Sequence, residues 1–285
     1  MKMLFLEEAI MKFLFFFLIL STLLQAAGIE DAKTYHGNSL LQWRIATEII
    51  DSIPLRESER ILDVGCGDGK ITALLAGKID KGSVLGIDIS QSMIDFASSH
   101  YSQTNYPNLA FQKQDAAELF FENQFDRVVS FSTLHWVLDQ DKALKAIYRA
   151  LVLGGIVCIH TYGKSPMNVT TVGDLLVHTE KWAPHFPSYS KQRVFFTEQE
   201  YRALLEQAGF QQVQVIGCWD NTAFLNRQAL IDFAKPLLNF IRHLPPDIQQ
   251  EFVEEVVDRM ISIANPLNGE PIQYRTFSLR AQGTK

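Results

Sequence analysis

One ten-residue segment constrains the fold of this chain more than any other. The short apolar run Ile61-Leu62-Asp63-Val64 leads directly into Gly65-Cys66-Gly67-Asp68-Gly69-Lys70, where glycine occupies every second position of the loop. Glycine reaches backbone conformations with positive φ and lacks a Cβ, so a ligand can approach the main chain closely. A helix that starts at Lys70 would add free N–H groups at its first turn. The segment therefore predicts a strand, a tight ligand-binding loop and a helix.

Short β-rich runs alternate with helical stretches around this segment. We predict strands at 60–64, 84–89, 109–112, 127–131 and 156–160, and helices at 70–78, 91–101 and 139–151, with Ser90 as an N-cap. Strands that alternate with helices form parallel, right-handed, doubly wound sheets. The expected fold class is therefore α/β.

The remaining segments extend this core on both sides. We expect one domain over 29–285, with its core at 57–162 and a proline-containing lid insertion at about 163–194. The C-terminal part at 195–285 should hold a helical insert at about 222–268, made of two helices separated by Pro245-Pro246. Residues 1–28 contain a short basic start and about twelve apolar residues, which resembles a secretory signal peptide and is short for a membrane span. A cleaved signal, a membrane-associated helix and a misplaced start site all remain open for these residues.

Composition excludes some classes of partner. The net charge is −6 and no long basic run occurs, which argues against a nucleic-acid partner because phosphate binding needs clustered Lys and Arg. The three cysteines give no disulfide framework and favour a reducing compartment. His178 and His185 lie seven positions apart without further ligands at metal-binding spacing, so we expect no metal site.

Three aspartates follow or end consecutive predicted strands. Asp63 stands two positions before the first glycine, where a carboxylate suits a ligand with an amino group better than a pyrophosphate. Asp88 ends the second strand, the position that accepts hydrogen bonds from ribose hydroxyls in doubly wound folds. Asp115 follows the third strand and could accept from an adenine amine. A dinucleotide fits less well, because the third glycine comes one position early for that fingerprint.

With the fourth strand and the Leu134-His135-Trp136 stretch after it, these segments resemble the class I S-adenosylmethionine-dependent methyltransferases over roughly 35–210. The resemblance implies a Rossmann-like sheet, S-adenosyl-L-methionine as cofactor, and a methyltransferase activity. It places the glycine loop and Asp63 around the methionine part, Asp88 at the ribose, and later residues at the adenine and beside the sulfonium. The implied cofactor-binding residues are Asp63, Gly65, Cys66, Gly67, Gly69, Asp88, Ile89, Asp115, Ala116, Ser130 and Phe131.

A narrower resemblance concerns the acceptor. Residues 38–42, 134–137 and 193–210 are similar to the trans-aconitate and juvenile-hormone-acid methyltransferases, which esterify carboxylates. The Leu-His-Trp stretch also resembles malonyl-carrier-protein methyltransferases, so the acceptor stays open. Gln42, His135 and Trp136 are carried over as the catalytic, substrate-side candidates.

The predicted function is O-methylation of a small or lipophilic carboxylic acid. A carboxylate is already ionised at pH 7, so these residues would orient it without removing a proton. For a hydroxyl or carbon acid, His135 would be the candidate base. The alternatives are a quinone-precursor or lipid methyltransferase at a membrane, and a non-catalytic donor-binding protein.

The implied partners and location follow from this function. The predicted partner is a small-molecule acceptor, with membrane association through the N-terminal segment left open. We expect a cytoplasmic location, because the methyl donor is held inside cells, with secretion as the alternative that the signal-like segment keeps open.

Overall fold

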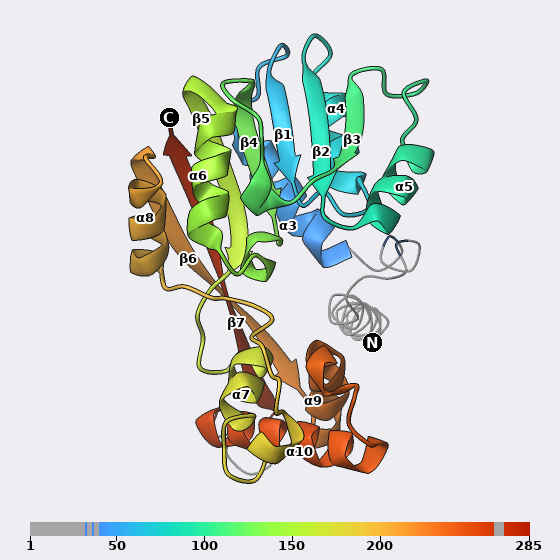
Figure 1. The fold of residues 1–285 in the computed structure, drawn as a ribbon, viewed down its shortest axis with the longest axis vertical. Helices are drawn as coiled ribbons and strands as arrows, with labels where there is room; N and C mark the ends of the chain where they lie inside the picture. The colour runs from blue at the N-terminus through green and yellow to red at the C-terminus, as the bar shows by residue number, and fades with distance from the viewer. Residues whose placement is uncertain (1–31, 33–35, 37–39, 265–270) are drawn as a thin grey trace, which may run out of the picture. The chain divides into compact units, whose positions relative to one another are not determined.

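The computed structural model describes residues 32, 36, 40–264 and 271–285 (Figure 1). The segment 1–28, for which a signal-like or membrane-associated helix was predicted, lies outside these residues. Among the residues described, no helix is both long enough and apolar enough to cross a membrane. The chain divides into two compact units. A sheet unit holds Gln42–Ser165, Gln192–Asp220 and Thr276–Lys285, and a helical unit includes Pro166–Lys191 and Asn221–Arg275.

The described strands form one seven-stranded sheet in the order β3-β2-β1-β4-β5-β7-β6. Strands β1 to β5 pair in parallel, and β7 runs antiparallel to β5. This confirms the predicted doubly wound, Rossmann-like sheet and adds an antiparallel edge to it. The strand order reverses beside β1, and ligands of such sheets bind at the carboxyl ends of the strands near this point. The strands are β1 (Arg60–Val64), β2 (Ser83–Asp88), β3 (Leu109–Lys113), β4 (Phe125–Phe131), β5 (Leu151–Tyr162), β6 (Gln211–Phe224) and β7 (Ile272–Thr284).

Helices cover both faces of the sheet unit. Figure 1 shows α6 on the near face and α3 and α4 behind the strands. Leu62 packs in the same buried cluster as Leu144 of α6, whereas Ile61 packs with Ala46 of α3 and Leu75 of α4. Parallel strands with helices on both faces need apolar residues on both sides, which explains the continuous apolar runs. The unit's helices are α3 (Leu40–Ser52), α4 (Lys70–Lys78), α5 (Gln91–His100), α6 (Gln140–Ala150) and α8 (Glu198–Gln207), with 3-10 turns η1 (Ala116–Glu118) and η2 (Leu134–Trp136).

The helical unit has a core of its own. Trp182, Phe186 and Phe252 pack together in this core, with Trp182 and Phe252 in edge-to-face contact at 4.8 Å. Its helices are α7 (Val169–Leu176), α9 (Arg227–Ala234) and α10 (Pro246–Ala264), with 3-10 turns η3 (Ala183–His185), η4 (Lys235–Leu237) and η5 (Asn239–Ile241). A lid function for residues 163–194 stays a prediction.

The expected pair of helices split only at Pro245-Pro246 was partly wrong. Helix α10 does begin at Pro246, but the preceding helix already ends at Ala234, and two 3-10 turns follow it. Proline at position 236 lacks a backbone N–H and so cannot continue the helix there.

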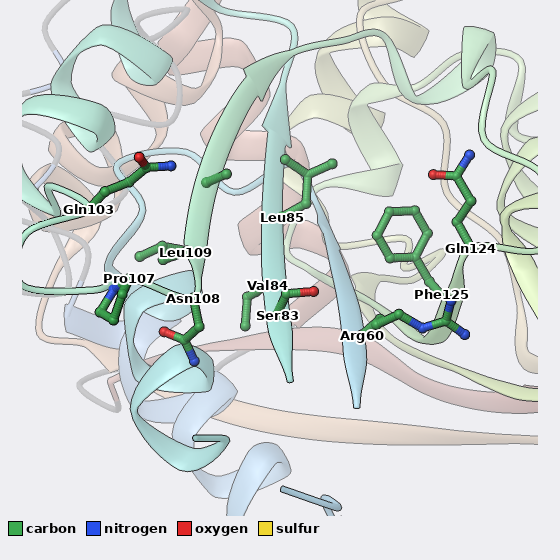
Figure 2. Close-up of a pocket in the computed structure, with 11 residues that line it drawn as sticks. Arg60, Ser83, Val84, Leu85, Gln103, Pro107, Asn108, Leu109, Gln124 and Phe125 are labelled. Atoms are coloured by element: carbon green, nitrogen blue, oxygen red, sulfur yellow. The ribbon is translucent and has the colours of Figure 1, made fainter. Parts of the chain in front are cut away.

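The connection between β3 and β4 contains the short turn η1 in place of a longer helix. An open pocket of about 500 Å³ lies at the amino ends of the strands, lined by Arg60, Ser83, Leu109 and Phe125 among others (Figure 2). The glycine loop leaves the opposite, carboxyl end of β1. The pocket is therefore separate from the predicted donor site.

A buried ion pair anchors the amino end of β1 to β4. Arg127 donates through Nε to Glu59 at 2.8 Å, and both side chains are 3% exposed. The same guanidinium donates to the carbonyl of Pro54 at 3.0 Å. Removing one member of such a pair leaves an uncompensated charge in the interior, which costs about 3–5 kcal/mol.

Arg127→Met is therefore expected to lower the free energy of unfolding by about 3–5 kcal/mol. The matched control is Arg56→Met, because Arg56 pairs with the same Glu59 at 3.3 Å but its side chain is 71% exposed. That control should cost at most about 1 kcal/mol. Urea denaturation measures both, and equal effects of the two substitutions would contradict the assignment.

Candidate active site

The glycine loop is bound to the neighbouring strand by its own backbone. The N–H groups of Gly65 and Cys66 donate to the carbonyl oxygen of Ile87 in β2, at 2.8 and 2.9 Å. Gly65 has φ +77°, and a Cβ built on it would lie 2.0 Å from the side chain of Thr133. Glycine is required at position 65 for its conformation and for this close approach. The thiol of Cys66 is buried, and burial raises its pKa well above the usual range, so it is no nucleophile at neutral pH.

The loop after β4 closes over the glycine loop. Thr133 Oγ1 lies 3.1 Å from the carbonyl oxygen of Gly65, to which it can donate. The preceding Ser132 has φ +54°, which is uncommon for a residue with a side chain. Its N–H donates to the carbonyl of His160 at 2.8 Å, and its hydroxyl lies 3.2 Å from Nδ1 of the same histidine. Sequence analysis overlooked Ser132 and Thr133, although their place directly after the fourth strand could have drawn attention to them.

Asp63 is a buried carboxyl group that is only partly satisfied. Its side chain accepts a 2.7 Å hydrogen bond from the hydroxyl of Thr72 through Oδ2, while Oδ1 is buried with no hydrogen-bond partner among the described residues. Burial raises the pKa of Asp63 to about 7, and the nearby carboxylates Asp88 and Asp68 raise it further, against the donation from Thr72. A cationic group beside Oδ1 would satisfy this oxygen and favour the ionised form.

Asp88 ties the second strand to the glycine loop. Its Oδ2 accepts from the N–H of Gly67 at 3.0 Å, and its Oδ1 accepts from the N–H of Ser90 at 2.9 Å. Burial raises the pKa of Asp88. Each carboxylate oxygen has two acceptor positions, so both can accept a further bond from a hydroxyl group.

Residues predicted for the adenine end lie directly after β2 and β3. Ile89 is 65% exposed, which leaves an apolar side chain available for a base to pack on. The N–H of Gln114 donates to the carbonyl of Asp88 at 2.9 Å and so joins the ends of the two strands. Asp115 caps the turn η1 by accepting from the N–H of Ala117 at 2.8 Å, next to Ala116.

Ser130 and Phe131 end β4, but their side chains serve packing. The hydroxyl of Ser130 is buried and donates to the carbonyl of Val64 at 2.9 Å. Phe131 is 6% exposed and packs in the cluster behind the sheet with α3. Their place beside the sulfonium stays a prediction. In this arrangement their backbone, and not their side chains, would contact the donor there.

The substrate-side candidates His135 and Trp136 lie in the turn η2. His135 is 2% exposed, and its ring contacts the rings of Tyr162 and Phe195 at 5.0 and 6.0 Å. Burial lowers the pKa of His135 well below its usual value, with a further contribution from the charge of Arg193. His135 is therefore neutral at pH 7 and a weak base. Trp136 is half-buried and carries the Arg193 guanidinium on its ring face, 3.9 Å from the centroid.

Gln42, the third candidate, lies near the start of α3, which sits by the carboxyl ends of the parallel strands (Figure 1). It is 3% exposed, and neither atom of its amide has a hydrogen-bond partner within the part of the chain described. A buried amide without partners costs free energy, so a ligand that hydrogen-bonds it would be stabilised there. No group of three or more His, Cys, Asp or Glu residues in the described ranges is arranged to hold a metal ion.

The site thus combines a glycine loop held by β2 and Thr133 with a buried carboxyl group, Asp63, whose Oδ1 is unsatisfied, and a half-buried one, Asp88. These groups suit a nucleoside that carries an amino group, and they suit a pyrophosphate poorly. Fold and site together define the S-adenosylmethionine-binding class of α/β enzymes.

Comparison with known proteins agrees with this class. A family model described as a methyltransferase domain matches residues 55–209, more than half of the chain. Among curated relatives, juvenile hormone acid O-methyltransferase of Bombyx mori is 29% identical and covers 89% of this chain and 98% of its own. A malonyl-[acyl-carrier protein] O-methyltransferase of Priestia megaterium is 26% identical over 63% of this chain and 65% of its own.

Solved structures share the fold. The YcgJ protein from Bacillus subtilis aligns with a TM-score of 0.62 at 19% identity, covering 85% of this chain and 98% of that one. Phosphoethanolamine N-methyltransferase 2 of Haemonchus contortus, in complex with S-adenosyl-L-methionine, aligns with a TM-score of 0.53 at 21% identity, covering 85% and 52%. The chain belongs to the methyltransferase domain family and is an S-adenosylmethionine-dependent methyltransferase.

The pKa of Asp63 leads to a first test of the donor site. If Asp63 binds the donor's ammonium group, affinity for S-adenosylhomocysteine should rise about tenfold from pH 5.5 to 7, because the carboxyl must lose its proton. The ligand's amino group stays protonated over this range. Calorimetry on the wild type and on Asp63→Asn measures this, and the variant should show weak binding without the pH dependence.

Stability provides the control for that experiment. The pKa of Asp63 in the folded chain lies above its unfolded value, so the stability that its neutral form provides is lost as pH rises from about 4 to 7. Asp63→Asn should therefore melt at a higher temperature than the wild type at pH 8. A variant that melts lower, or a wild type whose affinity is flat with pH, would contradict the role of Asp63.

Asp88→Ala should weaken donor binding by roughly 1–3 kcal/mol, the range for losing a hydrogen bond to a charged group. Asp88→Asn keeps an acceptor oxygen for one of the two backbone amides and separates the loss of charge from loosening of the loop. Calorimetry with S-adenosylhomocysteine gives the affinities, and unchanged binding of the alanine variant would exclude the ribose assignment.

Proposed function

We propose that this methyltransferase transfers a methyl group to the carboxylate oxygen of a small or lipophilic carboxylic acid. The observation that carries the proposal is the state of His135, the candidate base, whose pKa burial holds well below its usual value. A base this weak suits an acceptor that has already lost its proton. Carboxylic acids have done so at pH 7, whereas hydroxyl groups and carbon acids have not.

The relatives support the same acceptor class. Juvenile hormone acid O-methyltransferase, which matches along 98% of its length, is named for an acid acceptor, and the malonyl-carrier-protein enzyme is named for O-methylation of a malonyl group. Both names describe esterification. Neither identifies the acid that this chain would use.

Gln42, His135 and Trp136 are proposed to orient the acceptor. The Gln42 amide can donate to a carboxylate oxygen, and the half-buried ring of Trp136 offers an apolar wall. Bound S-adenosylmethionine would supply an electrophilic methyl group and leave as a neutral thioether, so no acid is required of the protein. The residues' task is to hold the reacting atoms at about 3 Å and in line, which can contribute several kcal/mol.

The proposed donor residues are those around the glycine loop. Asp63 would hold the amino group, Asp88 the ribose hydroxyls, and Ile89 with Asp115 and Ala116 the adenine. Membrane association through residues 1–28 stays a prediction, and the acceptor assay therefore includes lipid vesicles as a separate condition.

The test is methyl transfer from labelled S-adenosylmethionine to a panel of saturated fatty acids, aromatic acids and tricarboxylic acids, with mass spectrometry of the product. We expect a methyl ester whose formation does not require a base with a pKa near 7 in the enzyme, so kcat should stay flat between pH 6 and 8. Trp136→Ala should reduce acceptor turnover by far more than it reduces donor affinity. Methylation of an alcohol, a phenol or a lipid headgroup in place of an acid would overturn the proposal.

A further inference from the structure

The segment before α8 lies against the predicted acceptor residues. The N–H of Val194 donates to the carbonyl of His135 at 2.9 Å, and the N–H of Lys164 donates to the carbonyl of Phe196 at 2.8 Å. The backbone at positions 194 and 196 is therefore held beside η2 and the residues that follow β5. Arg193 is the residue that this segment places next to Trp136.

The guanidinium of Arg193 is buried and stacked. The residue is 8% exposed, and its Cζ lies 3.9 Å from the centroid of the Trp136 ring. Stacking on a ring face leaves the N–H groups at the edge of the guanidinium plane. Arginine has five such donors in a planar fork, enough for its other interactions in the protein and for a bidentate bond to one carboxylate.

The charge of Arg193 acts beside a cluster of aromatic rings. This charge contributes to the low pKa of His135. Burial and the exposed Asp220 raise the pKa of Tyr162 to about 12, and the charge of Arg193 acts in the opposite direction. Around it, His135 is neutral, and Tyr162 and Phe195 contribute ring faces and edges to the same cluster. An anion in a setting of low dielectric is attracted to such a cation more strongly than in water.

We propose that Arg193 selects the acceptor by receiving its carboxylate on the guanidinium that Trp136 supports. The aromatic surroundings fit an acid with one carboxylate and an apolar body, in preference to a tricarboxylic acid. The inference rests on the proposed carboxylate methylation and adds the group that distinguishes an acid from its neutral analogues.

The test compares octanoate with octanamide, which has the same chain and shape but no charge. Binding of each to the protein saturated with S-adenosylhomocysteine is measured by calorimetry. Wild-type protein should prefer octanoate by at least about tenfold, and Arg193→Gln should reduce octanoate affinity by about tenfold or more while octanamide changes little. Arg193→Lys keeps the charge without the fork and should retain part of the preference. Arg149→Gln is the matched control, because it removes an exposed charge on α6 and should change neither affinity.

The outcomes separate this inference from the proposed function. If the wild type does not prefer octanoate although it binds S-adenosylhomocysteine, both the carboxylate assignment and the role of Arg193 fail. If the wild type prefers octanoate and Arg193→Gln keeps the full preference, Arg193 is not the selecting group and the carboxylate assignment stands. S-adenosylhomocysteine affinity and thermal melting of each variant report its folding. If Arg193→Gln does not fold, the lysine variant provides the test. An unchanged preference for octanoate in Arg193→Lys would exclude bidentate recognition by the arginine.

Discussion

The parallel pairing of β1 with β2 is the constraint on which the candidate donor site depends. Its register sets Asp63 opposite Gly86 and Val64 opposite Ile87. The carbonyl of Ile87 can therefore accept from two N–H groups of the glycine loop, and the next residue, Asp88, meets the loop at Gly67. A slip of one residue in this pairing would turn every side chain of β1 to the other face of the sheet. The loop conformation thus depends on the sheet as much as on its glycines.

The buried carboxyl groups at the two ends of β1 have different partners. At the amino end, Glu59 has its cation in the chain, because Arg127 lies 2.8 Å away and equally buried. At the carboxyl end, the side chain of Asp63 has only the hydroxyl of Thr72 as a hydrogen-bond partner among the described residues, and the charges of Asp88 and Asp68 raise its pKa further. The Glu59–Arg127 pair is complete without a ligand. Asp63, in contrast, keeps an unsatisfied oxygen to which a cationic ligand could donate. The unfavourable group lies where binding can compensate for it, a pattern common to functional sites.

The sequence predicted the parallel sheet, the helices of its core and the positions of Asp63 and Asp88 at strand ends, since these follow from local periodicity and loop chemistry. It did not predict the contacts between residues that lie far apart in the sequence. Thr133 closing on Gly65 joins residues 68 positions apart, and the Ser130 hydroxyl bonds a carbonyl 66 positions away. The burial of His135 and its contact with the 193–196 segment are equally non-local. The neighbours of a residue in such a sheet depend on the order of the strands, and the local sequence pattern does not give that order. The N-cap at Ser90 could be predicted because its partner, Met93, is three residues away.

Opposite charges distinguish the two sides of the proposed reaction centre. Asp63 and Asp88 make the donor side acidic, which suits a sulfonium compound with an amino group. Arg193 makes the side near Trp136 basic, which suits an ionised acid. Each reactant would then be held by charge opposite to its own, and an uncharged hydroxyl acceptor would gain nothing from the arginine. Because a methyl cation equivalent passes from a positive to a negative partner, both charges disappear in the products. The attraction that gathers the reactants is therefore lost on reaction, which favours release of a neutral ester from a site that binds the anionic acid.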